Sequence, residues 1–171
     1  MPLLPGAHDG GWRRFAVVLP LVPMAVGERY AVRDWPLHVT IAPVFRTTAG
    51  TPLLAHVLGD AARGHAPLAC TAGAEELFGA RHDTPVALVE PHPGLESLHS
   101  WFSRRLAAEL AGRFAYENPH FTGAGFRPHV TATSRGRAIP GQRLDLAQLA
   151  LVDMAPGPGP GRPEVVAVAA L

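Results

Sequence analysis

The sequence contains no lysine, a single cysteine and no long apolar run. A lone cysteine excludes an internal disulfide framework and fits a reducing cytoplasm. The strand-like context of residues 68–72 predicts that Cys70 is a buried thiol rather than a nucleophile. No apolar run approaches the length of about 20 residues that a membrane-spanning helix needs, and residues 1–11 lack the pattern of a signal peptide. We therefore expect a cytoplasmic protein without a membrane partner.

The near balance of charges excludes a further class of function. With a formal net charge of +1, the chain is not built to coat long nucleic acids, because that requires many cations along the phosphate backbone. Four arginines nevertheless gather in residues 127–143 with no acid between them, namely Arg127, Arg135, Arg137 and Arg143. Because a guanidinium pairs bidentately with phosphate oxygens, this cluster is either a phosphate-facing patch or a solvated loop.

Histidine and threonine stand two residues apart in two similar tetrapeptides, HVTI at 38–41 and HVTA at 129–132. Side chains alternate between the two faces of a β-strand, so the histidine and threonine share one face while the apolar residues take the other. Two such strands at one cleft would offer two imidazoles and two hydroxyls to a phosphodiester, where one histidine takes a proton and the other gives one. The alternative is that both are ordinary strand histidines on a solvated face.

The His-x-Thr motif alone is a weak signal, because it occurs four times in the chain. In one further copy, His82-Asp83-Thr84 is followed by Pro85, which marks the start or edge of a strand. In the other, His120-Phe121-Thr122 runs into Gly123-Ala124-Gly125, a loop composition. Only the first pair lies in alternating, strand-like sequence, so we take that pair as the candidate site.

Other kinds of chemistry find little support in the sequence. The nine histidines form no HExxH motif, and the chain has no paired CxxC or close histidine cluster of the kind that binds zinc. No glycine-rich loop follows a strand and opens a helix, so an NTPase or dinucleotide-binding protein is disfavoured. No GxSxG elbow is present. We expect neither a metal nor a cofactor.

Hydrophobic periodicity predicts an antiparallel α+β fold, because runs of strands alternate with only two long helices. Residues 1–12 are expected to form a poorly ordered lead, and residues 13–171 a single domain. Thr51 is expected to cap the first helix, with Pro52 in its first position. The predicted strands are 15–19, 37–42, 68–71, 77–78, 85–90, 128–133, 144–153 and 164–170, and the predicted helices are 51–64 and 95–111.

With these motifs, the chain resembles the two-histidine (2H) phosphoesterases, and within them the RNA 2′,3′-cyclic phosphodiesterase and 2′-5′ RNA ligase-like proteins. The resemblance rests on the two His-x-Thr strands, the opening strand 15–20, Leu37 before the first motif and Arg127-Pro128 before the second. It implies a duplicated fold of two pseudo-symmetric lobes, with antiparallel sheets forming a central cleft and helices packed outside.

The resemblance also implies metal-independent chemistry at four residues. His38 and His129 would act as acid and base, and Thr40 and Thr131 would hydrogen-bond the phosphate. Family members often carry a basic residue soon after the second motif. In this chain the candidate for that residue is Arg135, which stands farther from the motif because Thr133 and Ser134 intervene.

The expected activity is therefore hydrolysis of the 2′,3′-cyclic phosphates of RNA ends or small nucleotides, by a monomer without an obligate protein partner. Five residues are candidates for substrate contacts: Arg127 and Arg135 for the phosphate, and Trp35, Phe45 and Phe121 for stacking on a base at the cleft rim. Two alternatives stay open. The same histidines would serve 2′-5′ phosphodiester ligation or cleavage, and the chain would also fit a catalytically idle module that binds RNA or nucleotides.

Overall fold

The computed structural model describes residues 11–154 and 162–171. Its strands are β1 (Arg13–Pro20), β2 (His38–Thr47), β3 (Leu68–Phe78), β4 (Thr84–Val89), β5 (Phe114–Tyr116), β6 (His129–Thr131), β7 (Arg143–Leu146), β8 (Gln148–Asp153) and β9 (Glu164–Ala170). Its helices are α1 (Thr51–Gly64) and α2 (Pro93–Glu109), with short 3-10 turns η1 (Val32–Asp34), η2 (Pro119–Phe121) and η3 (Gly123–Gly125). Most of the lead expected over residues 1–12 lies outside the described residues.

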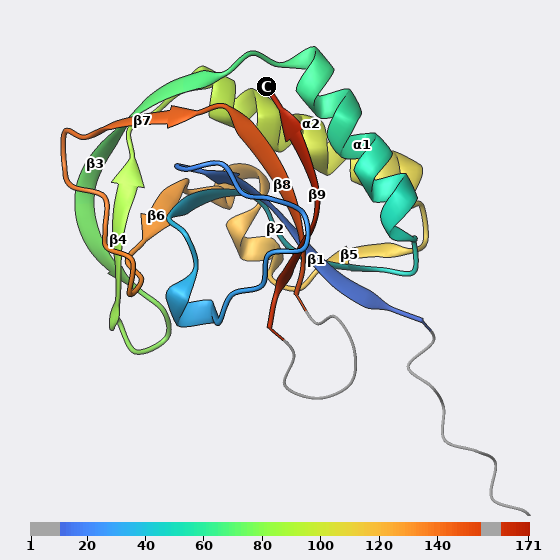
Figure 1. The fold of residues 1–171 in the computed structure, drawn as a ribbon, viewed down its shortest axis with the longest axis horizontal. Coiled ribbons are helices and arrows are strands. Elements are labelled where there is room, and N and C mark those ends of the chain that lie inside the picture. The colour runs from blue at the N-terminus through green and yellow to red at the C-terminus, as the bar shows by residue number, and fades with distance from the viewer. Residues whose placement is uncertain (1–10, 155–161) are drawn as a thin grey trace, which may run out of the picture.

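The described strands form one curled antiparallel sheet, so the predicted α+β class is confirmed (Figure 1). Their order is β7-β3-β4-β6-β2-β1-β8-β9, with β5 added beside β2. The two motif strands, β6 and β2, are direct neighbours near the middle of this order. Strands β7, β3 and β4 continue the sheet on one side of this pair, and β1, β8 and β9 continue it on the other. The topology therefore joins the two motifs, which are far apart in the sequence.

The helices pack on the same side of the curled sheet (Figure 1). Helix α1 contacts β8 and β9, while α2 lies against β2. The apolar stripe of α1 is buried as its spacing predicts, at Leu54, Val57, Leu58 and Ala61. Gly50 rather than Thr51 is the N-cap residue, because Gly50 has the extended backbone of a cap and Thr51 is already helical. None of the described helices is long and apolar enough to cross a membrane.

Several strands are longer than the sequence indicated. β2 does not end at Pro43 but continues to Thr47, because a bulge accommodates the proline. Pairing with β1 is regular up to Thr40, and Ile41 is an extra residue before Ala42 pairs with Val17. The pairing shifts again before Phe45, so Pro43 and Val44 both stand opposite Ala16. β3 is likewise one strand rather than two, with an irregularity between Ala72 and Glu75. The predicted strand 144–153 is divided into β7 and β8.

One large apolar core unites both halves of the sheet. It includes Phe15 and Leu19 of β1, Ala87 of β4, Phe102 of α2 and Leu144 of β7, among others. Cys70 lies in the same core, and burial raises the pKa of its thiol. The prediction of a buried cysteine is therefore confirmed, and a neutral thiol in apolar surroundings is chemically inert.

Candidate active site

The pairing of β2 with β6 gathers both motifs on one face of the sheet. Val39 is the register partner of Val130, and both side chains are buried in the core. Because neighbouring side chains alternate along a strand, the flanking histidines and threonines all take the opposite face. In an antiparallel pair this register sets Thr40 across from His129 and His38 across from Thr131. The two histidines are then diagonal neighbours, at a typical separation of about 7–8 Å.

Each histidine is oriented by the same local hydrogen bond. His38 Nδ1 lies 2.8 Å from the Pro36 carbonyl oxygen, and His129 Nδ1 lies 2.7 Å from the Arg127 carbonyl oxygen. A carbonyl oxygen only accepts, so Nδ1 carries the hydrogen in both rings and Nε2 is left for chemistry. Among the residues that the structure describes, neither Nε2 has a hydrogen-bond partner. Both motifs therefore present the same ring nitrogen, in the same tautomer.

An aromatic ring supports each imidazole from the side. Trp35 meets His38 edge-on, with ring centroids 4.8 Å apart, and Phe78 meets His129 in the same manner at 4.7 Å. The hydrogen bond to the backbone carbonyl and the aromatic contact together fix the plane of each imidazole ring. The same two contacts thus hold each imidazole in place before any substrate binds. Such preorganisation lowers the free-energy cost of positioning the reacting groups.

Burial lowers the pKa of both histidines. In each case the loss of hydration disfavours the charged ring, and the hydrogen bond to a backbone carbonyl only partly opposes this effect. The nearby charge of His129 lowers the pKa of His38 further, and Arg127 does the same for His129. At neutral pH both imidazoles are consequently neutral in the free protein. A bound phosphate would favour protonation of either ring.

A cavity of about 370 Å³ opens on the motif face. Its walls include Thr40, His129 and Thr131, together with Arg127 and Phe121. The structure therefore brings together five of the residues that the sequence singled out. His38 does not line this cavity, because its ring is partly buried against Trp35.

Arg127 reaches this cavity but is already engaged by an acid. Its Nη2 donates to both carboxylate oxygens of Glu76, at 2.9 and 3.0 Å. Its guanidinium also lies over the Phe78 ring, 5.2 Å from the centroid. Glu76 and Phe78 both belong to β3, so this strand holds Arg127 at the edge of the site.

The other arginines of the predicted patch are dispersed. Arg135 Nε donates to the Asp34 carbonyl oxygen at 2.7 Å, and its guanidinium lies over Tyr30 in a different cavity. Arg137 pairs with Glu75 at 3.6 Å. Arg143 pairs with Asp145 at 2.8 Å. Of the two alternatives that the sequence left open, the four arginines therefore do not form a common phosphate-facing patch. Arg127 and Arg137 pair with glutamates of β3, whereas Arg143 pairs with an acid of its own strand and Arg135 with a backbone carbonyl of η1.

Two of the three aromatic residues assigned to the cleft rim are buried. The prediction for Phe45 is wrong: its side chain is 0% exposed, because β2 continues past Pro43 and Phe45 is paired with Phe15 on one side and Tyr116 on the other. Trp35 is also mostly buried, at 8% exposure, and it supports the His38 ring rather than offering an open face. Phe121 is the residue that does line the cavity.

The two remaining His-x-Thr copies lie outside the motif strands, as their context predicts. His82 lies in the turn between β3 and β4, where its φ of 52° places it in the left-handed region. His120 lies in the short turn η2. Neither histidine lies on β2 or β6, although Thr84 lines the cavity of the motif residues and His82 lines an adjoining cavity.

Three contributors to the site escaped sequence reasoning. Phe78 and Glu76 come from a strand whose sequence shows no link to the second motif. His99 of α2 was expected only to pack against its neighbours. It is buried, but both of its ring nitrogens also make hydrogen bonds. Its Nδ1 lies 2.8 Å from the Ile41 carbonyl oxygen, and its Nε2 accepts from the Gly123 N–H at 3.0 Å. It thereby ties β2 to the loop before β6.

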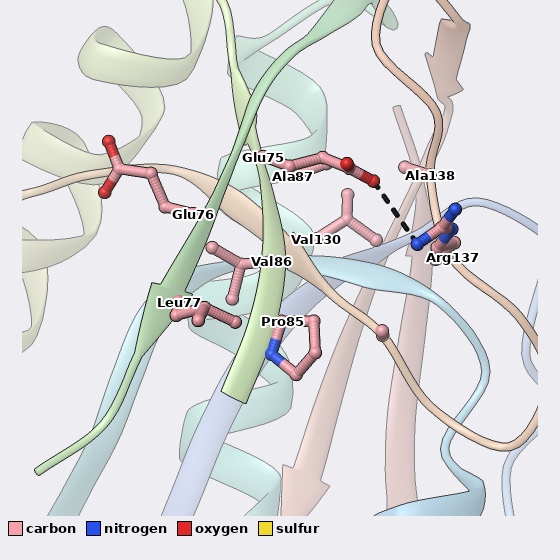
Figure 2. A pocket seen from close by; sticks show the side chains of 10 residues that line it. Glu75, Glu76, Leu77, Pro85, Val86, Ala87, Val130, Arg137 and Ala138 are labelled. Atoms are coloured by element: carbon pink, nitrogen blue, oxygen red, sulfur yellow. Dashed lines mark ion pairs between the residues drawn. The ribbon is translucent and has the colours of Figure 1, made fainter. Parts of the chain in front are cut away.

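A larger cavity of about 560 Å³ lies on the side of β6 that Val130 faces (Figure 2). Figure 2 shows two consecutive glutamates of β3 pointing in different directions, with Glu75 turned toward Arg137 and Glu76 turned away from it. Neither motif histidine lines this cavity.

Within the described part of the chain, no three His, Cys, Asp or Glu side chains gather as a metal site would require.

Comparison with known proteins identifies the class. A family model described as the 2′-5′ RNA ligase superfamily matches residues 7–152. The chain belongs to this superfamily, and the resemblance to the 2H phosphoesterases is confirmed. No curated protein sequence matches the chain.

Solved structures share the fold at low identity. Escherichia coli LigT complexed with NADP+ is 18% identical, with a TM-score of 0.57, over 94% of this chain and 98% of that one. A crystal structure described as a phosphoesterase is 22% identical, with a TM-score of 0.55 and the same coverage. A Thermus thermophilus protein is 17% identical, with a TM-score of 0.59, over 92% of this chain and 97% of that one. These likenesses establish the LigT-like fold.

Proposed function

We propose that the chain hydrolyses 2′,3′-cyclic phosphates of RNA ends or small nucleotides by two-histidine acid–base catalysis. The observation that carries the proposal is the equivalence of His38 and His129. Both lie on one face of neighbouring strands, and both bind a backbone carbonyl through Nδ1, which leaves Nε2 for proton transfer. A phosphodiester needs this pair of groups, because one oxygen must lose a proton while another gains one.

In this mechanism one imidazole takes a proton from water as the water attacks phosphorus in line. The other imidazole protonates the ribose oxygen that leaves, so the cyclic diester opens to a phosphomonoester. The diagonal placement of the two rings across β2 and β6 suits groups that bracket one phosphorus atom from opposite sides. The fixed ring orientations supply the positioning on which phosphoryl transfer chiefly depends.

The threonines and Arg127 would bind the phosphate itself. Thr40 and Thr131 line the same cavity as His129, and their hydroxyls would donate to the non-bridging oxygens. Arg127 lies on the same wall and brings a positive charge. A cyclic ester contains its own leaving group and some ring strain, and these residues therefore suffice without a metal.

The nature of the ligand is supported by relatives. LigT has been crystallised with 3′-AMP, with phosphate and with ATP. A site of this shape in the present chain would take a nucleotide or the last residue of an RNA strand.

One alternative is favoured by the superfamily itself, whose description names 2′-5′ RNA ligase. Ligation would use the same two histidines, with a 5′-hydroxyl replacing water as the attacking group. The two activities differ in that group alone, so the products separate them.

The test is a panel of 2′,3′-cyclic nucleotides and 2′-5′ dinucleotides incubated with the protein, with and without excess chelator. The proposal expects ring opening of the cyclic nucleotides that persists with chelator and disappears in a His38→Ala, His129→Ala double variant. Turnover confined to 2′-5′ linkages would replace it with the alternative. Binding without turnover of any substrate would instead indicate an idle module, and activity that needs a divalent ion would refute the two-histidine mechanism.

A further inference from the structure

A second cavity continues the candidate active site toward the β3–β4 turn. It has a volume of about 530 Å³ and shares Phe78, Gly79, Phe121 and Arg127 with the cavity that contains His129. A phosphate held by the motif residues would therefore leave the rest of its nucleotide beside this space. The second cavity is large enough to matter for substrate choice, and its walls combine an aromatic face with polar groups.

The aromatic face belongs to Phe121, whose side chain is 48% exposed. Hydrogen bonds and a close backbone contact hold its loop in place. The Thr122 hydroxyl donates to the Pro119 carbonyl oxygen at 2.7 Å, and buried His99 accepts from the Gly123 N–H. A Cβ on Gly125 would collide with the His120 carbonyl oxygen, so only glycine fits there. An exposed phenyl ring on such a loop is a suitable platform for a nucleobase.

The polar group is the carboxylate of Glu76, which lines the same cavity. Both of its oxygens contact a single nitrogen of Arg127. An ionised carboxylate offers about four acceptor positions, so the pair with Arg127 leaves acceptor capacity toward the cavity. A carboxylate accepts hydrogen bonds from a base amino group, such as the N4 amino group of cytosine.

We propose that this second cavity is a base subsite that selects bases with an exocyclic amino group. Phe121 stacks on the base, and Glu76 accepts a hydrogen bond from the amino group. Cytosine and adenine satisfy this acceptor, whereas uracil and hypoxanthine place a carbonyl oxygen at the same position and are repelled by the carboxylate. The inference rests on the proposed function, because the motif residues must fix the phosphate for the base to reach this wall.

A simpler role for Glu76 would be to hold Arg127 in position. The two roles predict different results. If Glu76 acts only through Arg127, its loss lowers the turnover of all nucleotides alike. If it contacts the base, its loss changes the ratio between matched substrates that differ in a single group.

The experiment compares kcat/KM for the 2′,3′-cyclic phosphates of cytidine and uridine, and of adenosine and inosine. A hydrogen bond to a charged group contributes about tenfold or more to discrimination, so the amino base of each pair should be preferred by about tenfold. Glu76→Gln should bring both ratios close to one, because an amide can donate to a carbonyl oxygen as readily as it accepts from an amine. The matched control is Glu75→Gln, since Glu75 is the neighbouring residue on β3 and lines the larger cavity of Figure 2 but not the proposed subsite, whereas Glu76 lines both.

Further measurements separate the possible failures. Phe121→Ala should raise KM for all four substrates while the ratios persist. Wild-type ratios near one, or ratios that survive Glu76→Gln, would overturn the proposal. If no substrate is turned over, the proposed function fails. In that case the subsite is tested by binding of cytidine and uridine 3′-monophosphates, where equal affinities would also overturn it and a preference lost in Glu76→Gln would support it.

Discussion

At the scale of single residues, the two histidines are alike in their bonds and different in their surroundings. Both donate a hydrogen bond from Nδ1 to a backbone carbonyl oxygen. His38 is packed against buried Trp35, whereas His129 lies beside Phe78 and near Arg127. Enzymes commonly divide acid and base roles between similar groups by giving them different environments. The same principle would distinguish the two imidazoles of this site.

The first prediction concerns this pair. His38→Ala or His129→Ala should each lower kcat toward cyclic nucleotides by about 10²–10⁴, the usual contribution of one general acid or base. Thr40→Ala and Thr131→Ala remove a neutral hydrogen bond and should cost less. His120→Ala is the control, since it shares the His-x-Thr spelling without a place on β2 or β6. An equal loss in the control would contradict the assignment of the site.

The second prediction concerns the pH dependence of kcat/KM. One imidazole must be neutral and the other protonated, so the profile should be bell-shaped. Burial lowers the pKa of both histidines, so the singly protonated pair is most populated on the acid side of the ordinary histidine value of about 6.5. We expect the maximum below that pH, from initial rates at low substrate concentration. A maximum above pH ~7.5 would show that groups other than these lowered-pKa histidines control the reaction.

At the scale of elements, the site depends on how β2 is embedded. The strand passes through a bulge at Pro43 and continues to Thr47, so that β5 pairs with its second half. Strand β6 pairs with its first half, and β1 pairs with both halves. Helix α2 packs on the same strand, and its His99 binds the Ile41 carbonyl oxygen. The first motif is therefore held along its whole length, whereas the second lies on a short strand, His129–Thr131, between β4 and β2.

The third prediction tests this embedding through Phe45. The side chain is fully buried, with its ring near those of Phe15 and Phe114 at centroid distances of 6.1 and 5.6 Å. Removing such a ring creates a cavity, so Phe45→Ala should lower the free energy of unfolding by about 3–5 kcal/mol. Denaturant unfolding followed by fluorescence or circular dichroism measures this loss. A change below about 0.5 kcal/mol, typical of surface positions, would place Phe45 at the rim after all.

At the scale of the whole molecule, three histidines couple stability to pH. Burial lowers the pKa of His38, His99 and His129. His99 shows the cause most directly. Its Nδ1 donates to a carbonyl and its Nε2 accepts from the Gly123 N–H, so a second ring proton would face another donor. The folded state therefore holds all three rings in the neutral form.

The fourth prediction follows from this linkage. A histidine whose pKa is lower in the folded state binds fewer protons there than in the unfolded chain, so acid favours unfolding. The free energy of unfolding should be maximal above pH ~7 and should fall as the pH drops below about 6.5, the unfolded value, until the folded pKa values are passed. Urea denaturation at several pH values measures the slope. In His99→Gln the slope should be shallower, and an unchanged slope would remove His99 from this account.

Features that follow from local geometry could be predicted from the sequence. The alternation of side chains along a strand indicated that His38 and Thr40 share a face, and the stripes of α1 and α2 indicated which helix residues are buried. These periods are set by the backbone of a single segment, so no distant contact is needed to predict them. The context of Thr84 and Thr122 likewise distinguished the four His-x-Thr copies.

How distant segments meet could not be predicted from the sequence and is seen in the folded chain. The register of Val39 with Val130 makes one site from two motifs. β3 supplies Phe78 to support His129 and Glu76 to hold Arg127, and η1 draws Arg135 away from the site. Such contacts depend on which strands become neighbours and on which acids then lie near each arginine. A pattern within one segment does not predict these contacts, because they arise from the packing of the whole chain.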